Sequence, residues 1–454
     1  MTNQLNRLSF FLISSIIVLT TLLYGAVHQP ILVLFYVAVT LLATLWAAEA
    51  IASGKLKYSR SLLQLPLILL AVYAIAQTIP IGVTSEAGGV SAIPHTVSVD
   101  PFSTQVTALH IFALAAFFCL VLVVLRSAAA LRSFTTLLTV FGFVYAFYAI
   151  LQSVLSPDAI YGIYRPQATP FGSFVNKHDF AAFMEMSISI PLGLLFTGAV
   201  RRDKRLLYGI AIALMASSLL LSGSRGGLVA MTAGLIFLII LTSRATGKKD
   251  LILKAGLSAA LVTAAIGGAL FVGSETSLTR FADTANTPDI TSSRTQIWSD
   301  TLKMIGEYMP LGAGVGAYGD AFTRYDTTSG YFRVEQAHND YLQLVADAGI
   351  AGIVIGAGFL YLFFRQGVRG IRQDNVFRRG IAIGAFTGCF AVLVHSLFDF
   401  VLHITAISSM FLALLALLIA AGRKFDDDIT EFDDNPAYRR RKASVTPISN
   451  PDPR

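Results

Sequence analysis

The chain has 454 residues, of which 55% are hydrophobic and only 13% are charged. A mean hydropathy of +0.66 excludes an ordinary soluble domain, because such a domain could not keep so much apolar surface from water. We therefore predict an integral membrane protein, whose net charge of +7 reflects membrane topology and gives no reason to expect a nucleic-acid partner.

A helix needs roughly 20 apolar residues to cross the hydrocarbon layer of a membrane. Because the apolar runs are continuous and do not alternate, they predict helices and not a β-barrel. We expect an all-α polytopic domain over residues 1–421, in contact with membrane lipids. In chain order, the sequence predicts about twelve transmembrane helices: 7–26, 29–52, 61–80, 106–125, 134–155, 180–199, 205–222, 226–243, 252–273, 341–364, 378–398 and 404–421.

The distribution of positive charge predicts the orientation. If both termini are cytoplasmic, most of the 34 Lys and Arg fall in inner segments, and the outer loop 81–105 has none. This is the bias expected of a membrane protein. The first apolar stretch could instead be a cleaved signal peptide, but it is long for one and no small-residue cleavage site follows it.

Two segments differ from the rest. Residues 274–340 form one long outer loop, which contains an amphipathic helix predicted over 294–309 and ended by Pro310 and Gly312. A loop of this length with its own helix usually has a function. Residues 422–454 carry acidic and basic runs with little apolar surface, so we predict a disordered cytoplasmic tail.

Arginine dominates the outer positive charges, and its planar fork binds phosphate oxygens in pairs. Arg225 stands between two apolar stretches, where a charge needs a partner or a ligand. Arg225 is therefore a candidate catalytic residue. Arg165, Lys177 and Arg333 are candidates for substrate binding.

His338 and Asn339 directly precede another apolar stretch. A histidine titrates near neutral pH, so His338 could accept a proton from an attacking hydroxyl, although a helix cap is an equally plain explanation. Asn339 is a candidate substrate-binding residue. Gly349, Gly352 and Gly356 form a stripe that favours helix packing over chemistry.

His395 and Asp399 are four residues apart, so they should share one helical face, as a structural pair or as substrate ligands. No outer segment contains clustered metal-ligand spacings, and we expect neither a metal nor a cofactor. Cys119 and Cys389 lie in apolar stretches and predict no disulfide.

Several motifs together resemble those of the O-antigen ligase and polymerase superfamily. The run Ser222-Gly223-Ser224-Arg225-Gly226-Gly227 is similar to its SxSRGG signature, and residues 338–349 match its His-Asn, nine residues, Gly pattern. The segments 294–319, 174–181 and 395–400 resemble further landmarks of this superfamily. The resemblance covers residues 100–405.

This resemblance implies a metal-independent, GT-C-type glycosyltransferase of the bacterial inner membrane. Such a protein transfers a glycan from undecaprenyl diphosphate to an acceptor at the periplasmic face. Arg225 and Arg294 would contact the diphosphate, and His338 would activate or orient the acceptor hydroxyl. Preorganised cations suit this reaction, because one donor aimed at the developing charge contributes roughly 3–4 kcal/mol.

The acceptor stays open at this stage. Lipid A-core would make the protein an O-antigen ligase, another lipid-linked glycan would make it a polymerase, and a serine side chain would make it a protein O-oligosaccharyltransferase. All three need the same leaving-group chemistry. A secondary transporter is the rival from another class, but the two halves of the chain lack the visible similarity that many carriers show.

Overall fold

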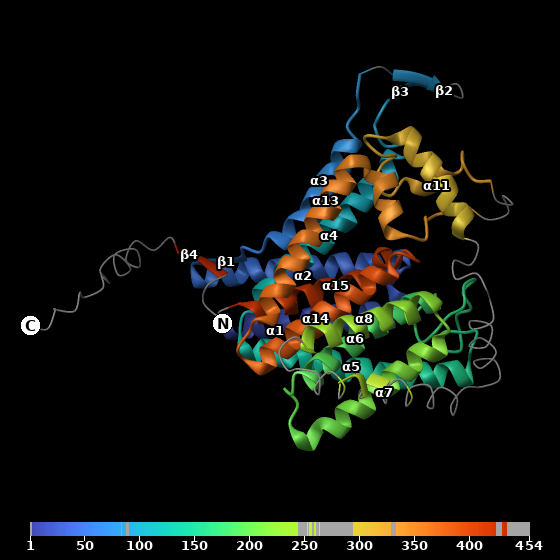
Figure 1. The fold of residues 1–454 in the computed structure, drawn as a ribbon. Coiled ribbons are helices and arrows are strands. Elements are labelled where there is room, and N and C mark those ends of the chain that lie inside the picture. The colour runs from blue at the N-terminus through green and yellow to red at the C-terminus, as the bar shows by residue number, and fades with distance from the viewer. Residues whose placement is uncertain are drawn as a thin grey trace, which may run out of the picture.

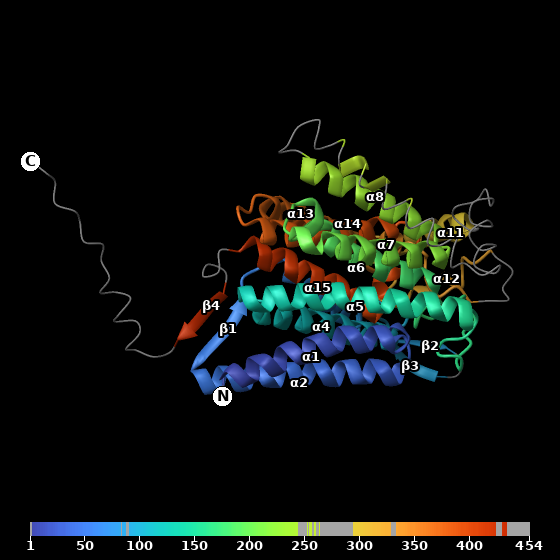
Figure 2. The same ribbon diagram turned by 90° about the horizontal axis from the view of Figure 1, so that it is seen from below.

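The computed structural model describes residues 2–243 (except 83, 88 and 89), a few positions between 252 and 263, and residues 294–327, 333–423 and 429–433. Most of its long helices lie side by side in one bundle, while α3, α4 and α13 lean away from the others (Figure 1). The view from below shows the short strands β1 and β4 at one end and the helix α11 at the other (Figure 2). We refer to these as the β1 end and the α11 end of the bundle.

The first half of the chain contributes these elements in order: α1 Thr2–Leu22, η1 Tyr24–Ala26, α2 Gln29–Ser53, β1 Lys55–Ser59, η2 Leu62–Gln64, α3 Leu65–Gln77, β2 Thr84–Ala87, β3 Val90–Pro94, α4 Pro101–Val124, α5 Ala128–Leu155, α6 Lys177–Phe196, η3 Arg202–Lys204, α7 Arg205–Ser222 and α8 Arg225–Ser243. The second half contributes these: α11 Arg294–Tyr308, α12 Tyr318–Phe322, α13 Asp340–Ile371, α14 Val376–His395, η4 Val401–His403, α15 Thr405–Gly422 and β4 Ile429–Asp433.

Among the described residues, ten helices are long and apolar enough to cross a membrane. The protein is therefore an all-α, multi-pass membrane protein, as its composition predicts. The expected span 61–80 forms a shorter apolar helix, Leu62–Gln77. Its last residue, Gln77, is buried, and the side-chain amide of Gln77 donates to the carbonyl oxygens of Leu311 and Asp347. The expected span 252–273 lies largely outside the described residues.

The centre of the bundle is built from α6, α14 and α15. Within the spans of α6 and α15, 94% of the residues are buried. Glycine allows α6 and α14 to touch, because a Cβ atom on Gly193 would lie 2.5 Å from the backbone of both Gly380 and Gly384. Small residues permit this close approach where lipid supplies no hydrophobic drive between helices. Gly193, Gly380 and Gly384 thus form a packing seam between α6 and α14.

Gly349, the first glycine of the stripe predicted on α13, has a different structural role. Gly349 has φ +55° and marks a kink inside α13, where a Cβ atom would lie 2.1 Å from the carbonyl oxygen of Pro310. Only glycine tolerates this conformation at so little cost. The prediction of a helix-packing seam is therefore wrong for Gly349, which seats the loop that follows α11.

That loop is a small folded unit. Apolar side chains of α11 and α12 pack with the start of α13 around Met304, Tyr318 and Phe322. The predicted amphipathic helix at 294–309 is confirmed as α11, with Arg294–Tyr308 as its bounds. One side of α11 thus covers a protein core. The loop is also held to α3, because the side-chain oxygen of Gln77 accepts a hydrogen bond from the N–H of Val315.

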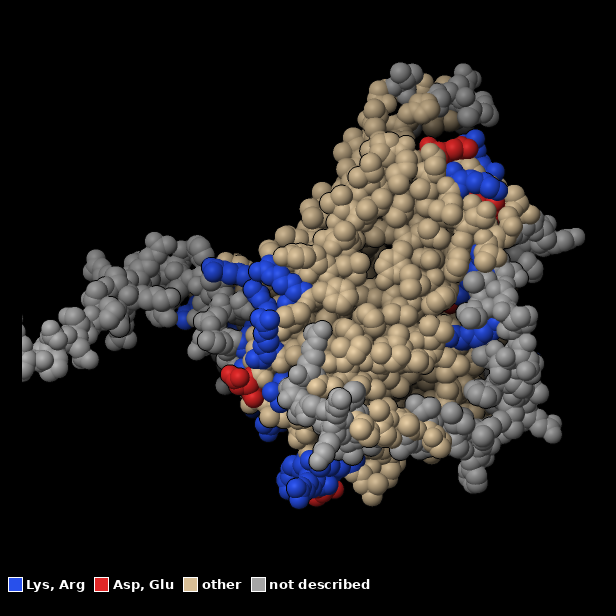
Figure 3. Space-filling view, in the orientation of Figure 1, with Lys and Arg blue, Asp and Glu red and all other residues tan. Residues whose placement is uncertain are grey.

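The β1 end collects positive charge. Figure 3 shows Lys and Arg gathered there, while the broad middle of the visible face carries no charged side chain. Glu49 is buried there and pairs with Lys57 at 2.7 Å and Arg126 at 3.2 Å. β1 pairs with β4 in antiparallel register. The tail predicted to be disordered therefore contributes a strand at Ile429–Asp433.

Candidate functional site

Two helix starts meet at the α11 end of the bundle. Asn176 caps α6 by accepting a hydrogen bond from the N–H of His178, which directs the His178 ring from the first turn. Ser224 precedes α8, and its hydroxyl accepts from the N–H of Gly227 at 3.2 Å. The same hydroxyl shares a hydrogen bond of 2.8 Å with His178 Nδ1. The signature segment around Arg225 is thereby tied to the start of α6.

His338 stands at the start of α13 in a left-handed conformation, with φ 50°. A non-glycine residue rarely adopts this conformation, and such strain is typical of functional positions. The neighbouring residues hold it there. The indole of Trp298 on α11 donates to the carbonyl oxygen of Ala337 at 3.0 Å, and Asn339 caps α13 by accepting from the N–H groups of Tyr341 and Leu342.

Asp399 is the centre of the site. Its Oδ1 accepts from Nδ1 of His338 at 3.1 Å, and its Oδ2 accepts from the guanidinium of Arg294 at 3.1 Å. Arg294 also donates to the carbonyl oxygen of Phe398. The side chain of Asp399 is only 3% exposed, whereas that of His338 is 30% exposed. A buried carboxylate therefore orients a histidine and an arginine that both remain in reach of solvent.

The electrostatics keep this carboxylate ionised. Burial would raise the pKa of Asp399, but the hydrogen bond from His338 and the positive charge of neighbours such as Arg294 hold that pKa below its ordinary value. An ionised Asp399 fixes the proton of His338 on Nδ1. The other ring nitrogen, Nε2, is then left as a proton acceptor.

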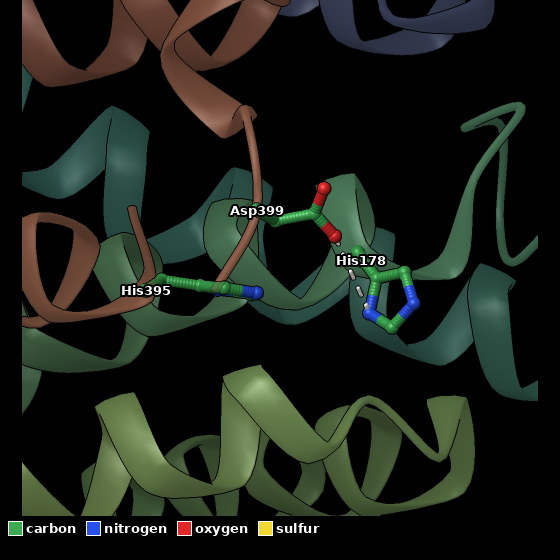
Figure 4. Close-up of side chains that lie close together, drawn as sticks. All are labelled: His178, His395 and Asp399. Atoms are coloured by element: carbon green, nitrogen blue, oxygen red, sulfur yellow. Dashed lines mark ion pairs between the residues drawn. The ribbon is translucent and has the colours of Figure 1, made fainter. Parts of the chain in front are cut away.

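A further histidine, His395, lies near Asp399. His395 is fully buried at the end of α14, and its Nδ1 shares a hydrogen bond of 2.8 Å with Glu185 of α6. The close-up in Figure 4 shows His395, Asp399 and His178 turned toward one region, with the ion pair between His178 and Asp399 dashed. Gly226 leaves room for this ring, since a Cβ atom there would lie 3.0 Å from His395 Nε2.

The expected pair between His395 and Asp399 does not form. The helix α14 ends at His395, and the His395 ring binds Glu185 while Asp399 binds His338 and Arg294. Reasoning from spacing along one helix could not reveal these partners, because each comes from a distant segment of the chain.

Possible metal ligands are present in the same place. Ligand atoms of His178, His395 and Asp399 lie within 4.8 Å of one another. Both oxygens of Asp399 already accept hydrogen bonds, and one of their donors is the permanently charged Arg294. A divalent cation would have to compete with that guanidinium. Metal-independent chemistry stays a prediction.

The other candidate residues lie on several different segments. Arg225 is the first residue of α8, directly after Ser224, and Lys177 precedes His178 at the start of α6. Both are partly buried. Arg165 is exposed in the loop between α5 and α6. Arg333 is paired with Asp320 at 2.9 Å and Glu335 at 3.0 Å, so it stabilises its own loop.

Asn339 is better explained as a support for His338 than as a substrate ligand. Its amide oxygen caps α13, and its amide nitrogen donates to the carbonyl oxygen of Leu397 at 3.0 Å. Neither His178 nor Glu185 is among the site residues predicted from the sequence. Glu185 lies inside the predicted span 180–199, where an ionisable residue is a signal of function, whereas His178 lies just before that span.

The arrangement suits acid–base chemistry beside an anionic group. His338 Nε2 can take a proton, Asp399 holds the ring, and Arg294 with Arg225 supplies positive charge at the same end of the bundle. The N-terminus of α8 adds the partial positive charge of its helix dipole.

Comparison with known proteins gives one family match. Residues 210–357 match the family described as O-Antigen ligase, a stretch that begins in α7 and ends in α13. A search of curated proteins gives no match. The matched stretch contains Arg225, Arg294 and His338, three of the residues that carry the resemblance in the sequence. Over residues 210–357 the chain is therefore similar to the O-antigen ligase superfamily.

Proposed function

We propose that this protein transfers a glycan from undecaprenyl diphosphate to the lipid A-core of lipopolysaccharide, at the periplasmic face of the bacterial inner membrane. The reaction class, glycan transfer by an O-antigen ligase-like protein, follows from the family match. The donor, the acceptor, the GT-C type and the orientation are parts of the proposal.

The observation that carries the proposal is the double use of Asp399. One carboxylate binds both the histidine suited to deprotonate an acceptor and an arginine suited to bind a phosphate. Their separation is thus fixed by a single side chain. A reaction that removes a proton on one side and releases a phosphate on the other needs such a fixed distance.

In the proposed step, the acceptor hydroxyl oxygen attacks the anomeric carbon of the glycan, and the proton of that hydroxyl passes to Nε2 of His338. The bond between that carbon and the diphosphate oxygen breaks, and its electron pair stays on the diphosphate. Arg294 and Arg225 stabilise this charge. The prenyl chain remains in the lipid beside the bundle.

The orientation follows from charge. The β1 end holds the clustered Lys and Arg, which favours the cytoplasm for that end and the periplasm for the α11 end (Figure 3). Both termini would then be cytoplasmic. Cysteines introduced singly at the exposed residues Arg165 and Arg202 should react with a membrane-impermeant maleimide in whole spheroplasts at the first position only. Reaction at the second position would reverse the topology.

A deletion strain provides the functional test. Gel analysis of its lipopolysaccharide should show an uncapped lipid A-core, with full-length glycan remaining on the lipid carrier. Single repeats on the core would identify a polymerase instead, and unchanged lipopolysaccharide with an unglycosylated protein would identify a protein transferase.

Variants then test the site. Arg225→Ala and His338→Ala, expressed at normal levels, should fail to restore capping, whereas Arg333→Ala should restore it, because Arg333 pairs within its own loop. Normal capping by the first two variants would refute the proposed roles.

A further inference from the structure

The segments that carry His338 and Asp399 are joined a second time. Asp340 lies two residues after His338, and His403 lies four residues after Asp399. His403 Nδ1 and Asp340 Oδ1 are 2.9 Å apart, and Asp340 Oδ2 accepts from the N–H of Leu402 at 3.3 Å. Each segment thus contributes one histidine and one aspartate, and the two His–Asp pairs stand side by side.

An aromatic ring separates the two pairs. The ring of Phe400 meets the His338 ring edge-on, with centroids 4.9 Å apart, and the His403 ring with centroids 6.4 Å apart. All three rings are at least partly exposed. The second pair is therefore close to the proton-accepting histidine, although no step of the proposed transfer uses it.

The surroundings of the second pair are polar on the side of the leaning helices. His403 lies within electrostatic range of His110 of α4. His110 Nδ1 shares a hydrogen bond of 3.1 Å with the hydroxyl of Tyr36 on α2. The His403 side chain is 38% exposed and that of Asp340 is 10% exposed. A ligand can therefore reach the exposed ring edge.

The two pairs differ in charge. Asp399 is paired with Arg294, whereas Asp340 and His403 pair with each other and with no Lys or Arg in the described part of the chain. An anionic diphosphate is favoured beside Arg294. A neutral ligand with many hydroxyl groups is favoured beside Tyr36, His110 and His403, which offer donors and acceptors without excess positive charge.

We propose that His403, Asp340, Phe400 and Tyr36 form the binding site for a sugar of the acceptor glycan. The hydroxyls of that sugar would bind His403 and Tyr36, and its apolar face would lie on Phe400. This site would hold the acceptor hydroxyl within reach of His338 Nε2. The inference rests on the proposed function, because it names the acceptor side of the same reaction.

The test uses the full chain, purified in lipid nanodiscs, with undecaprenyl diphosphate-linked O-antigen as donor and rough lipopolysaccharide as acceptor. His403→Gln and Tyr36→Phe should each raise the KM for rough lipopolysaccharide about fivefold, the effect of one lost hydrogen bond of about 1 kcal/mol. The KM for the donor should change less than twofold. A loss of folded protein would lower the apparent kcat but would not raise the KM for one substrate alone.

His95→Gln is the matched control, since His95 is exposed in the loop before α4. If His403→Gln does not fold, Tyr36→Phe decides the matter, because it removes a single oxygen atom. An unchanged KM for rough lipopolysaccharide in the folded variants overturns the inference. An equal rise in both KM values overturns it too, as does transfer by the wild type to a protein only. If the wild type does not release undecaprenyl diphosphate at all, the proposed function itself has failed.

Discussion

Replacing Asp399 by asparagine tests the centre of the site with almost no change in shape. In the wild-type protein, the two carboxylate oxygens accept from His338 and Arg294 at 3.1 Å each, and Oδ1 also accepts from the N–H of Phe400 at 3.0 Å. An amide offers one acceptor and one donor, so either His338 or Arg294 must lose its partner. A hydrogen bond to a charged group contributes about 1.5–3 kcal/mol. We therefore expect the kcat of Asp399→Asn to fall about 100-fold.

The assay is the initial rate of transfer from undecaprenyl diphosphate-linked O-antigen to rough lipopolysaccharide, normalised to folded protein. The double variant Asp399→Asn/His338→Gln gives the sharper answer. Because Asp399 orients both His338 and Arg294, the loss in the double variant should be smaller than the product of the two single losses. A rate for Asp399→Asn within threefold of wild type, or fully additive losses in the double variant, would refute the reasoning.

Three other predictions concern charge and packing. Arg294→Lys keeps the charge but loses the fork that binds both Phe398 and Asp399, so transfer should fall at least tenfold, while Arg324→Lys on the exposed surface should match wild type in the same assay. Gly193→Ala places a Cβ atom 2.5 Å from the backbone of α14, and this overpacking should lower the free energy of unfolding by about 1–3 kcal/mol and the unfolding temperature with it. Gly209→Ala has open space around it and should leave the unfolding temperature unchanged. Equal unfolding temperatures for the two variants would contradict the close packing of α6 on α14. Burial would raise the pKa of Asp300, but hydrogen bonds with Lys303, Thr327 and Gln296 lower it to about 2. The stabilisation by Asp300 is then complete above about pH 4 and is lost as the pH falls toward 2, so the melting temperatures of wild type and Asp300→Asn should differ most above pH 4 and converge in acid.

Much of the bundle could be predicted because a membrane span depends on local composition. The expected spans 29–52 and 404–421 agree with α2 and α15 to within one residue at each end. The predicted span 61–80 is longer than α3, whose last residue, Gln77, binds carbonyl oxygens of residues more than 200 positions away. Hydropathy carries no information about such contacts.

The site could be predicted only in part, for the same reason. Arg225 and His338 were identified because polar residues stand out at the ends of apolar stretches. The pairing of His338 with Asp399 joins residues 61 positions apart, and that of His395 with Glu185 joins residues 210 apart. Only the packing of α6 against α14 brings the second pair together. The four-residue spacing of His395 and Asp399 suggested a nearer but wrong partner.

The contact between α6 and α14 also limits how the protein can move during a reaction cycle. His178 begins α6 and His395 ends α14, while glycines hold the backbones of the two helices in direct contact farther along. Separating these helices would open a void in the bundle, so the two behave as one rigid half of the catalytic centre. Arg294, in contrast, belongs to α11, which packs with α12 and the start of α13 around a second, smaller core. The catalytic centre is therefore shared between two packing units, and the bond between Arg294 and Asp399 joins them.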